Sequence, residues 1–470
     1  MKGNSFFDCL IVGAGCAGCT LAKKLAEAGF KVALIERKAR NRIGHVWEVA
    51  LEKAVFGRIN IKFPPKKYWE EGPDISRYYV MNMDNHLQID SSNDDGFFIR
   101  HNRFNNHLLG LAEKAGAELR DKHWVSELII DNTNGSVTGI TGNRHTFFGS
   151  RQFGMKANVV VDASGIDAVL RRQTPDDFLI KRNIHRQDYA YGWNEVREVS
   201  RSQADQLQDA LGLAPGMLYT RLGKYRAYVV LHLRKNLTVN LIFGAAYSKG
   251  GDNARKMCKR FLEENPYFGK LLYGGGGMIP LRRSIDSMTA SGFLCIGDAA
   301  CQVIPTMGSG VASSMHAADI AARVITDAHN RQNFSREQLW TYNHKYQTKR
   351  GAVLASYDII RRFLQSISSE DMDEVFRAHL ITNENFINTF SSNIIEYDVN
   401  QILDNIVKVI SHISLLPLSL RFLQTLRDSQ RVYRLYKNYP ETFRQKNFIQ
   451  WEKNTSELFS HYSTIDTGHG

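Results

Sequence analysis

The residues with the most recognisable chemistry lie near the start of the chain, where a glycine-rich turn is followed by an acid. Gly13, Gly15 and Gly18 are spaced as G-x-G-x-x-G, directly after the apolar run Leu10–Val12. The first glycine permits a tight turn, the second lets the backbone approach a pyrophosphate, and the third lets a helix pack close to the strand. Glu36 ends the next apolar strand, where a carboxylate can accept the hydroxyls of an adenosine ribose. The segment therefore predicts a bound dinucleotide.

The elements around this turn fit the same interpretation. Cys16 and Ala17 open a helix that we expect to end near residue 28, and its positive N-terminus would face the phosphates. An acid at Glu36 argues against a 2′-phosphate and favours FAD or NAD over NADP. The next residue, Arg37, is also expected to bind the cofactor. Cys16 and Cys19 form a C-x-x-C pair, but they lie inside the phosphate turn, where small residues suit close packing better than redox chemistry.

Two later segments return to the same edge of the expected sheet. Asp162 and Gly165 follow the apolar strand 157–161, and ligands bind at the carboxyl ends of parallel strands. Asp298 follows another apolar strand and would take a ribityl hydroxyl. The helix expected over 311–328 would then aim its N–H groups at the flavin pyrimidine ring, stabilising negative charge on the reduced flavin. The residues expected in this third segment are Gly297, Asp298, Pro305, Gly308, Ser309, Gly310 and Val311.

The three motifs in this order resemble the FAD-binding set of the p-hydroxybenzoate hydroxylase-type flavoproteins, over roughly residues 6–330. Within that superfamily, Gly276-Gly277-Met-Ile-Pro280-Leu, followed by the third segment, is most similar to the geranylgeranyl reductase group. The resemblance implies FAD, flavin-mediated reduction of isoprenoid double bonds, electrons from NAD(P)H or ferredoxin, and a hydrophobic tunnel for a lipid tail. Arg103, before Phe104, resembles the arginine that lies against FAD in that family; a surface arginine near a helix start is the alternative.

The chain departs from the family pattern at two places. Family members usually carry a cysteine soon after the first acid, whereas this chain has Gly44-His45-Val46-Trp47-Glu48. Their substrate layer tends to carry Tyr-x-Trp, and the counterpart here is Tyr225-Arg-Ala227. The resemblance places His45, Trp47 and Tyr225 near the isoalloxazine ring, so these three are the candidates for catalysis, with packing or pocket lining as the alternative for each.

Other functions remain open on this scaffold. The alternative to C=C reduction is an FAD-dependent monooxygenase, either a hydroxylase or a halogenase-like enzyme, although the WxWxIP signature of the halogenases is absent. A carrier passing electrons to a quinone would add an iron–sulfur cysteine cluster, and no such spacing is present. The absence of HExxH spacing and the scattered histidines argue against a metal. FAD held only as a structural ligand is the non-enzymatic reading.

Charge and composition bear on the partners. The chain has 60 Lys and Arg against 48 Asp and Glu, a formal charge of +12, which suits an anionic cofactor, an acidic partner or a membrane surface. No nucleic-acid motif is present. Basic residues are concentrated over 416–446, where we expect a helix. This helix either docks on an anionic membrane or an acidic electron donor, or packs within the protein with its basic face in solvent. Sparse cysteines, no signal peptide and no long apolar run predict a cytoplasmic protein, with peripheral contact to the cytoplasmic membrane face as the open alternative.

The pattern of the whole chain predicts an α/β fold. We expect a Rossmann-like FAD-binding domain with an interleaved antiparallel β substrate domain and a C-terminal helical region. The FAD-binding domain is predicted to be discontinuous, over residues 1–62, 98–175 and 276–330. The substrate domain is predicted over 63–97 and 176–275, and the helical region over 331–470.

Overall fold

An eight-stranded sheet carries the glycine-rich turn. The computed structural model describes residues 6–80, 86–92, 96–146, 149–223, 227–247, 253–377 and 416–462. In these residues the sheet has the order β17-β18-β11-β1-β2-β8, with β10 on β11 and β9 on β10. Its strands are β1 (Phe6–Val12), β2 (Val32–Ile35), β8 (Glu118–Arg120), β9 (His123–Ile130), β10 (Val137–Thr146), β11 (Gly149–Asp162), β17 (Thr289–Ala290) and β18 (Phe293–Cys295).

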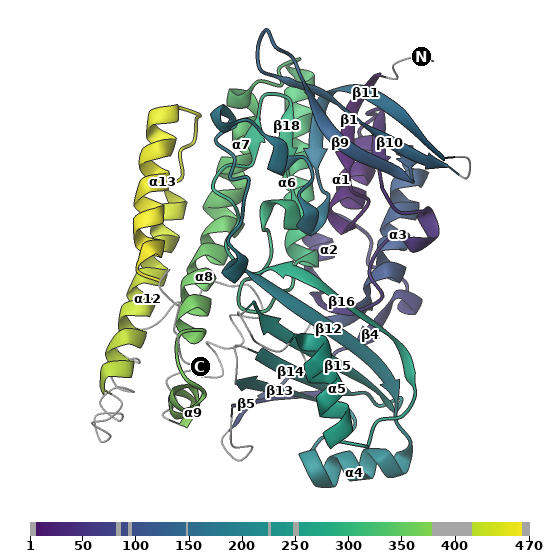
Figure 1. Ribbon diagram of the computed structural model, residues 1–470, viewed down its shortest axis with the longest axis vertical. Coiled ribbons are helices and arrows are strands. Elements are labelled where there is room, and N and C mark those ends of the chain that lie inside the picture. The colour runs from purple at the N-terminus through teal and green to yellow at the C-terminus, as the bar shows by residue number, and fades with distance from the viewer. Residues whose placement is uncertain are drawn as a thin grey trace.

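The centre of this sheet is parallel. β1 pairs in parallel with both β2 and β11, and Cys9 lies opposite Val32 on one side and Val159 on the other. All four residues of β2 are buried, as expected for a strand covered on both faces. The covering helices α1 (Cys16–Glu27), α3 (His101–Lys114) and α6 (Val311–Asn330) pack on one another, with α1 in the middle (Figure 1).

A seven-stranded sheet forms the second layer, in the lower half of Figure 1. Its order is β16-β12-β15-β14-β13-β5-β6, and only the β13–β5 pair is parallel. Helices α4 (Arg201–Leu211) and α5 (Ala254–Glu264) belong to the same layer. Its strands are β5 (Ile75–Tyr79), β6 (His86–Asp90), β12 (Tyr189–Glu198), β13 (Met217–Gly223), β14 (Ala227–Leu233), β15 (Thr238–Ala246) and β16 (Leu271–Pro280).

A small antiparallel sheet joins the two large ones. It has the order β3-β7-β4, with β3 (Glu48–Glu52), β4 (Trp69–Glu71) and β7 (Gly96–Arg100), and α2 (Ala54–Arg58) follows β3. This sheet therefore takes its strands from both sides of the boundaries expected at 62 and 97. β5 and β6, from the same expected 63–97 segment, belong to the seven-stranded sheet. The domain division itself stays a proposal.

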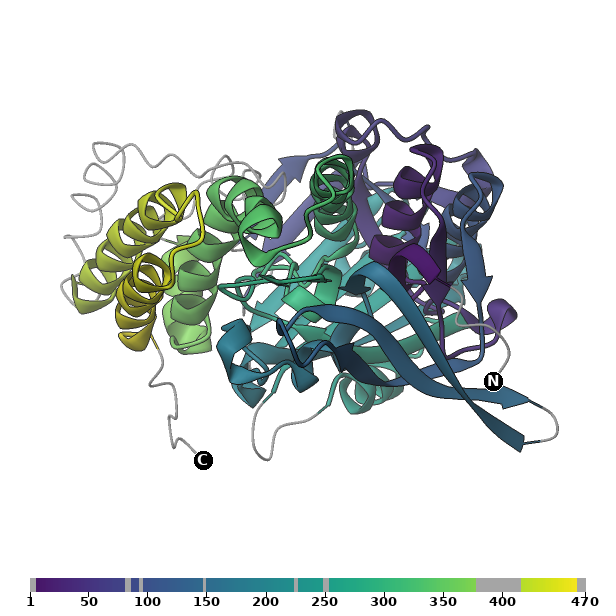
Figure 2. The same ribbon diagram turned by 90° about the horizontal axis from the view of Figure 1, so that it is seen from above.

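Helices complete the C-terminal part of the described chain. They are α7 (Arg336–Tyr346), α8 (Ala352–Leu364), α9 (Ser369–Arg377), α12 (Leu416–Lys437) and α13 (Gln445–Ser460), with a π-helical turn over Gln347–Gly351. Trp340 on α7 is fully buried and stacks on Tyr439 at a ring distance of 5.5 Å. Seen from above, α12 and α13 form one side of the molecule, and the β9–β11 strands reach out on the other (Figure 2).

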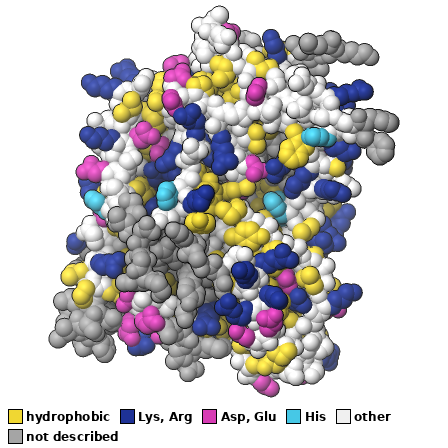
Figure 3. Space-filling model, in the orientation of Figure 1, with side chains coloured by type: hydrophobic (Ala, Val, Ile, Leu, Met, Phe, Trp, Pro, Cys, Tyr) yellow, Lys and Arg dark blue, Asp and Glu magenta, His cyan; other side chains and the backbone are white. Residues whose placement is uncertain are grey.

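These layers confirm the predicted fold class. The element types predicted for the Rossmann unit, the substrate layer and the helical region are those observed. In the described part of the chain, no helix is both long and apolar enough to cross a membrane. On the face shown in Figure 3, Lys and Arg side chains are spread over the surface among acidic ones.

Candidate active site

A cavity of about 690 Å³ collects most of the residues predicted from the sequence. Its wall is predominantly apolar, and its volume lies in the range of small-molecule sites. The predicted residues that line it are Gly13, Gly15, Cys16, Ala17, Glu36, Arg37, His45, Trp47, Gly165, Gly297, Asp298, Pro305, Gly308, Ser309, Gly310 and Val311. Three segments far apart in the sequence therefore meet at one site.

The glycine turn shapes one end of the cavity. Gly13 has a φ of +108°, and a Cβ on Gly18 would lie 2.0 Å from the carbonyl oxygen of Gly13. Gly18 is not among the residues that line the cavity. Because it has no side chain, α1 can start directly against β1. The first turn of α1 carries no acidic residue, so its positive end is free to face an anion.

Glu36 stands beside this turn. One of its carboxylate oxygens accepts the N–H of Ala14 at 3.0 Å, and the other accepts the N–H of Lys38 at 2.8 Å. Each carboxylate oxygen can accept a further hydrogen bond. The arrangement can therefore receive the two hydroxyls of a ribose.

The loop after β11 contributes through its backbone. Asp162 is fully buried and accepts N–H groups from Ser164, Leu170 and Arg171 at 2.7 to 3.0 Å. Asp162 is not among the residues that line the cavity, because its carboxylate holds the loop together, and its role at the cofactor stays a prediction. Gly165, in the same loop, does reach the cavity wall.

Asp298 faces the cavity from the third segment, and α6 begins nearby. Burial raises the pKa of Asp298 to about 6, because a desolvated carboxylate is harder to ionise. Gly310 is the N-cap of α6, whose first turn contains no acid. Ser309 donates its hydroxyl to the Ala50 carbonyl at 3.3 Å and so ties this loop to β3.

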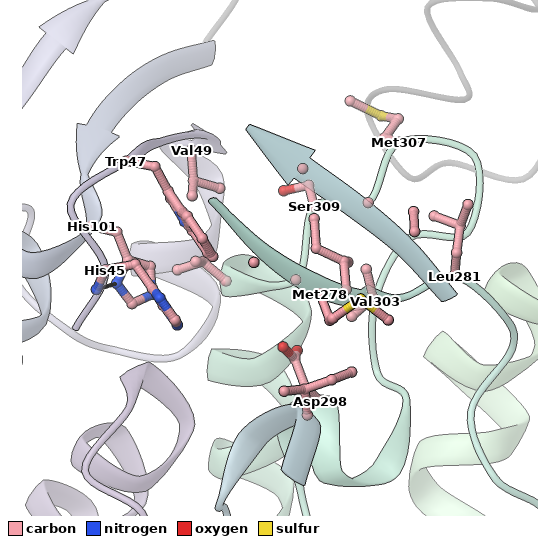
Figure 4. Close-up of a pocket in the computed structure, with 18 of the residues that line it drawn as sticks. His45, Trp47, Val49, His101, Met278, Leu281, Asp298, Val303, Met307 and Ser309 are labelled. Atoms are coloured by element: carbon pink, nitrogen blue, oxygen red, sulfur yellow. Dashed lines mark hydrogen bonds between the residues drawn. The ribbon is translucent and has the colours of Figure 1, made fainter. Parts of the chain in front are cut away.

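His45, Trp47 and His101 form one wall (Figure 4). The rings of His45 and Trp47 are stacked, with centroids 4.0 Å apart and planes within 3°. His101, the first residue of α3, accepts the His45 N–H on Nδ1 at 3.2 Å. The His101 backbone N–H donates to the Trp47 carbonyl at 2.9 Å. These hydrogen bonds hold the loop of His45 against the start of α3.

The two histidines are uncharged at neutral pH. Burial, His45 and Lys38 lower the pKa of His101 to about 3, and burial with Lys38 and Arg37 lowers the pKa of His45 to about 4. Because Nδ1 of His101 accepts a hydrogen bond, its proton lies on Nε2, which faces the Cys16 sulfur at 3.7 Å. Burial and Asp298 raise the pKa of Cys16 to about 12, so this sulfur stays a thiol.

The remaining two predicted residues are Arg103 and Tyr225. Arg103 is exposed and does not line the cavity. It lies two residues from His101, and residues two apart on a helix point about 200° away from each other. His101 is therefore the residue that this turn of α3 presents to the cavity, and the contact of Arg103 with FAD stays a prediction. Tyr225 lies outside the described residues.

A buried ion pair supports the segment that follows Trp47. The Glu48 side chain is completely buried and pairs with Arg234 on the chain that leaves β14. The Tyr273 hydroxyl donates to Glu48 at 2.5 Å, and the Glu48 N–H donates to Asn194 Oδ1 at 2.9 Å. Burial alone would lower the pKa of Arg234, but Glu48 raises it overall. This network joins the small sheet to the seven-stranded sheet.

The cavity extends along the seven-stranded sheet as a mostly apolar region, which we call the apolar arm. Alternate residues on β13 and β14 point toward it, as the two-residue period of a strand requires. The other side of the arm comes from α8, α9 and α12, whose contribution the sequence did not predict. Most lining residues of this arm are apolar or aromatic, and α8 adds the polar Arg361 and Gln365; the others are Tyr78, Leu218, Thr220, Leu222, Tyr228, Val230, Ile242, Ile360, Leu364, Met372 and Phe422.

Cysteine and metal chemistry find little support among the described groups. All six cysteines are free and buried. The described residues contain no cluster of three or more His, Cys, Asp or Glu side chains placed to hold a metal ion.

Comparison with known proteins gives a consistent result. A family model for an NAD(P)-binding Rossmann-like domain matches residues 11–79. Digeranylgeranylglycerophospholipid reductase from Sulfolobus acidocaldarius is 26% identical over 462 residues, covering 97% of this chain and 98% of its own.

Solved structures share the fold. A geranylgeranyl bacteriochlorophyll reductase-like protein from Thermoplasma acidophilum has a TM-score of 0.71 at 19% identity, covering 90% of this chain and 100% of its own. A variant of halogenase PltM in complex with FAD has a TM-score of 0.60 at 12% identity, covering 97% of this chain and 96% of its own. These comparisons confirm the predicted fold and the predicted resemblance to the geranylgeranyl reductases. In sequence and in fold, the chain therefore resembles the geranylgeranyl reductases.

Proposed function

We propose that this chain uses FAD to reduce carbon–carbon double bonds in a hydrophobic substrate of the isoprenoid or lipid-like class. One observation carries the proposal: a single cavity joins the glycine turn and Asp298 to an apolar arm lined by two tyrosines and many aliphatic side chains. A long apolar tail gains most from such an arm, because its burial removes apolar surface from water. The reductase names of the similar proteins support the same class.

The residues of the cofactor end fit FAD in type and order. Gly13 to Ala17 and the start of α1 would hold the pyrophosphate, and Glu36 would hold the adenosine ribose. Asp298 would accept a ribityl hydroxyl, and the N-terminus of α6 would lie against the pyrimidine ring. When bound, FAD supplies the redox chemistry.

The rest of the cavity wall would bind the substrate and shield it from water. The apolar arm excludes water and holds the tail, while burial raises the pKa of Tyr228 to about 12, so its hydroxyl stays protonated. Uncharged His45 and stacked Trp47 give the cofactor end a flat, neutral surface. We propose His45, Trp47 and Tyr225 as the residues to test for a direct role in the reaction.

The electron donor and the location belong to the same proposal. Electrons would come from NAD(P)H or a ferredoxin, as the resemblance implies. A lipid substrate would bring the protein to the cytoplasmic face of a membrane as a peripheral protein. The proposed division into FAD-binding, substrate and helical regions would then place the lipid arm between the last two.

The test is a single-turnover reduction. The FAD-loaded protein is reduced with dithionite without oxygen and mixed with a geranylgeranyl lipid, or with its saturated phytanyl analogue as the control. Reoxidation of the flavin by the unsaturated lipid alone, with a gain of two hydrogens per double bond by mass spectrometry, supports the proposal. Reoxidation by neither lipid refutes it.

Oxygen separates the alternative function. The FAD-dependent halogenase with the same fold keeps a monooxygenase open as a second function. The alternative predicts that the reduced protein does not react with the lipid in the absence of oxygen. In air, it would instead add one oxygen atom to the substrate, or a halogen atom when halide is present. That result would assign the monooxygenase or halogenase-like function.

A further inference from the structure

The outer face of α12 carries an arginine stripe. Positions spaced by three and four residues share one side of a helix, and seven such positions are solvent-facing, six on α12 and one directly after its last residue. None of the seven is acidic, and three are arginines. We define the arginine stripe as Pro417, Leu420, Gln424, Arg427, Arg431, Arg434 and Asn438.

The three arginines of the stripe make no ion pair with any residue that the structure describes. Other exposed arginines differ: Arg331 pairs with Asp327 at 3.2 Å, and Arg377 pairs with Asp373 at 3.0 Å. The acid nearest in sequence, Asp428, is buried and accepts the Tyr462 hydroxyl at 2.9 Å. The positive charge of the stripe is therefore not neutralised within the described part of the molecule.

The opposite face of the same helix lines the cavity. Phe422 is 4% exposed and forms part of the apolar arm, and its ring lies 5.6 Å from that of Phe363 on α8. A helix with its side chains is about 10–12 Å across. Only the thickness of one helix therefore separates the stripe from the space proposed for a lipid tail.

We propose that the arginine stripe docks the protein on an anionic lipid surface. A membrane is preferred to an acidic protein because the stripe lies behind the lipid arm, and this choice rests on the proposed function. Leu420, at one end of the stripe, is 57% exposed and can enter the headgroup region. A single exposed leucine gives little insertion, so the contact is mainly electrostatic and weakens as salt rises.

The experiment measures binding of the full-length FAD-loaded protein to vesicles without substrate. Vesicles of phosphatidylcholine with and without phosphatidylglycerol are pelleted at low and high salt. The triple variant R427Q/R431Q/R434Q should bind the anionic vesicles about a hundredfold more weakly than the parent, because each arginine contributes about fivefold at such a surface. Neutral vesicles should bind neither protein.

A matched control removes the same charge elsewhere. Arg144, Arg151 and Lys156 are exposed on β10 and β11, at the opposite edge of the molecule from α12 (Figure 1). The variant R144Q/R151Q/K156Q should keep most of the vesicle binding. Equal loss in both triple variants, or no binding of the parent to anionic vesicles, overturns the proposal. Loss of binding to an acidic ferredoxin by the stripe variant, with vesicle binding unchanged, would also overturn it in favour of a protein partner.

Binding and reaction are read separately. The stripe variant should reduce a detergent-dispersed lipid at the parental rate, because its substitutions lie outside the cavity. If vesicle binding depends on the stripe but no lipid is reduced, the docking surface stands and the proposed function fails.

Discussion

The proposed contact of Asp298 with FAD predicts that FAD binding depends on pH. The free protein holds the pKa of this carboxyl at about 6 through burial. A ribityl hydroxyl that donates to Asp298 favours the ionised form, so FAD binding should release a proton and tighten as pH rises. If only the ionised form binds, about one molecule in eleven is competent at pH 5 and about nine in ten at pH 7, which makes FAD about tenfold weaker at pH 5.

The assay is a titration of apoprotein with FAD, followed by flavin fluorescence, between pH 5 and pH 8. Affinity should rise to about pH 7 and then level off. His45 and His101 do not contribute, because their pKa values of about 4 and about 3 leave both neutral over this range. Asp298→Asn should flatten the profile. Asp167→Asn, which changes another cavity-lining acid, should retain it.

The reasoning is refuted by an affinity that does not change between pH 5 and pH 7 in the parent. It is equally refuted if Asp298→Asn keeps the parental slope, because the titrating group would then lie elsewhere.

Three further predictions concern the supports of the site. Glu48→Ala should lower the free energy of unfolding by about 3–5 kcal/mol in urea titrations, because it leaves the buried charge of Arg234 without a partner. The double variant Glu48→Leu/Arg234→Met should recover most of this loss. If it does not, the loss of the ion pair is not the cause. Gly18→Ala should abolish FAD retention, because the added Cβ clashes with the Gly13 carbonyl. The control Gly110→Ala adds a Cβ at an open position on α3 and should retain FAD. Equal FAD content in the two purified proteins contradicts the prediction. His101→Leu should weaken FAD binding about fivefold by removing the acceptor of the His45 N–H, an effect that unchanged fluorescence titrations would exclude.

Local patterns explain what the sequence could predict. Gly13, Gly18 and Glu36 act within one strand–turn–helix–strand unit, so their spacing carries their geometry. Asp298 follows a buried strand and could be placed at the same sheet edge by the rule for parallel sheets. The antiparallel β character of the substrate layer follows from residue pattern, and the seven-stranded sheet confirms it.

Long-range contacts explain what the sequence could not predict. His101 meets Cys16 across 85 residues, and no spacing rule connects them. A helix start was foreseen near Arg103, but its rotation depends on how α3 packs on α1. Phe422 was equally invisible as a cavity residue, because its role depends on α12 returning beside α8. Glu and Arg are usually exposed to solvent, so the burial of Glu48 with Arg234 could not be predicted from their types. It depends on strands that are far apart in the sequence.

The parallel pairing of β1 has a consequence for how this chain folds. β2 follows soon after β1 and can pair with it early, whereas the other neighbour of β1 is β11, whose Val159 meets Cys9 from far along the sequence. Closing so large a loop is slow. During synthesis, one apolar edge of β1 would stay open until β11 emerges, and such edges recruit other chains. Expression conditions that slow aggregation, rather than conditions that stabilise the finished fold, should therefore decide the yield of active protein.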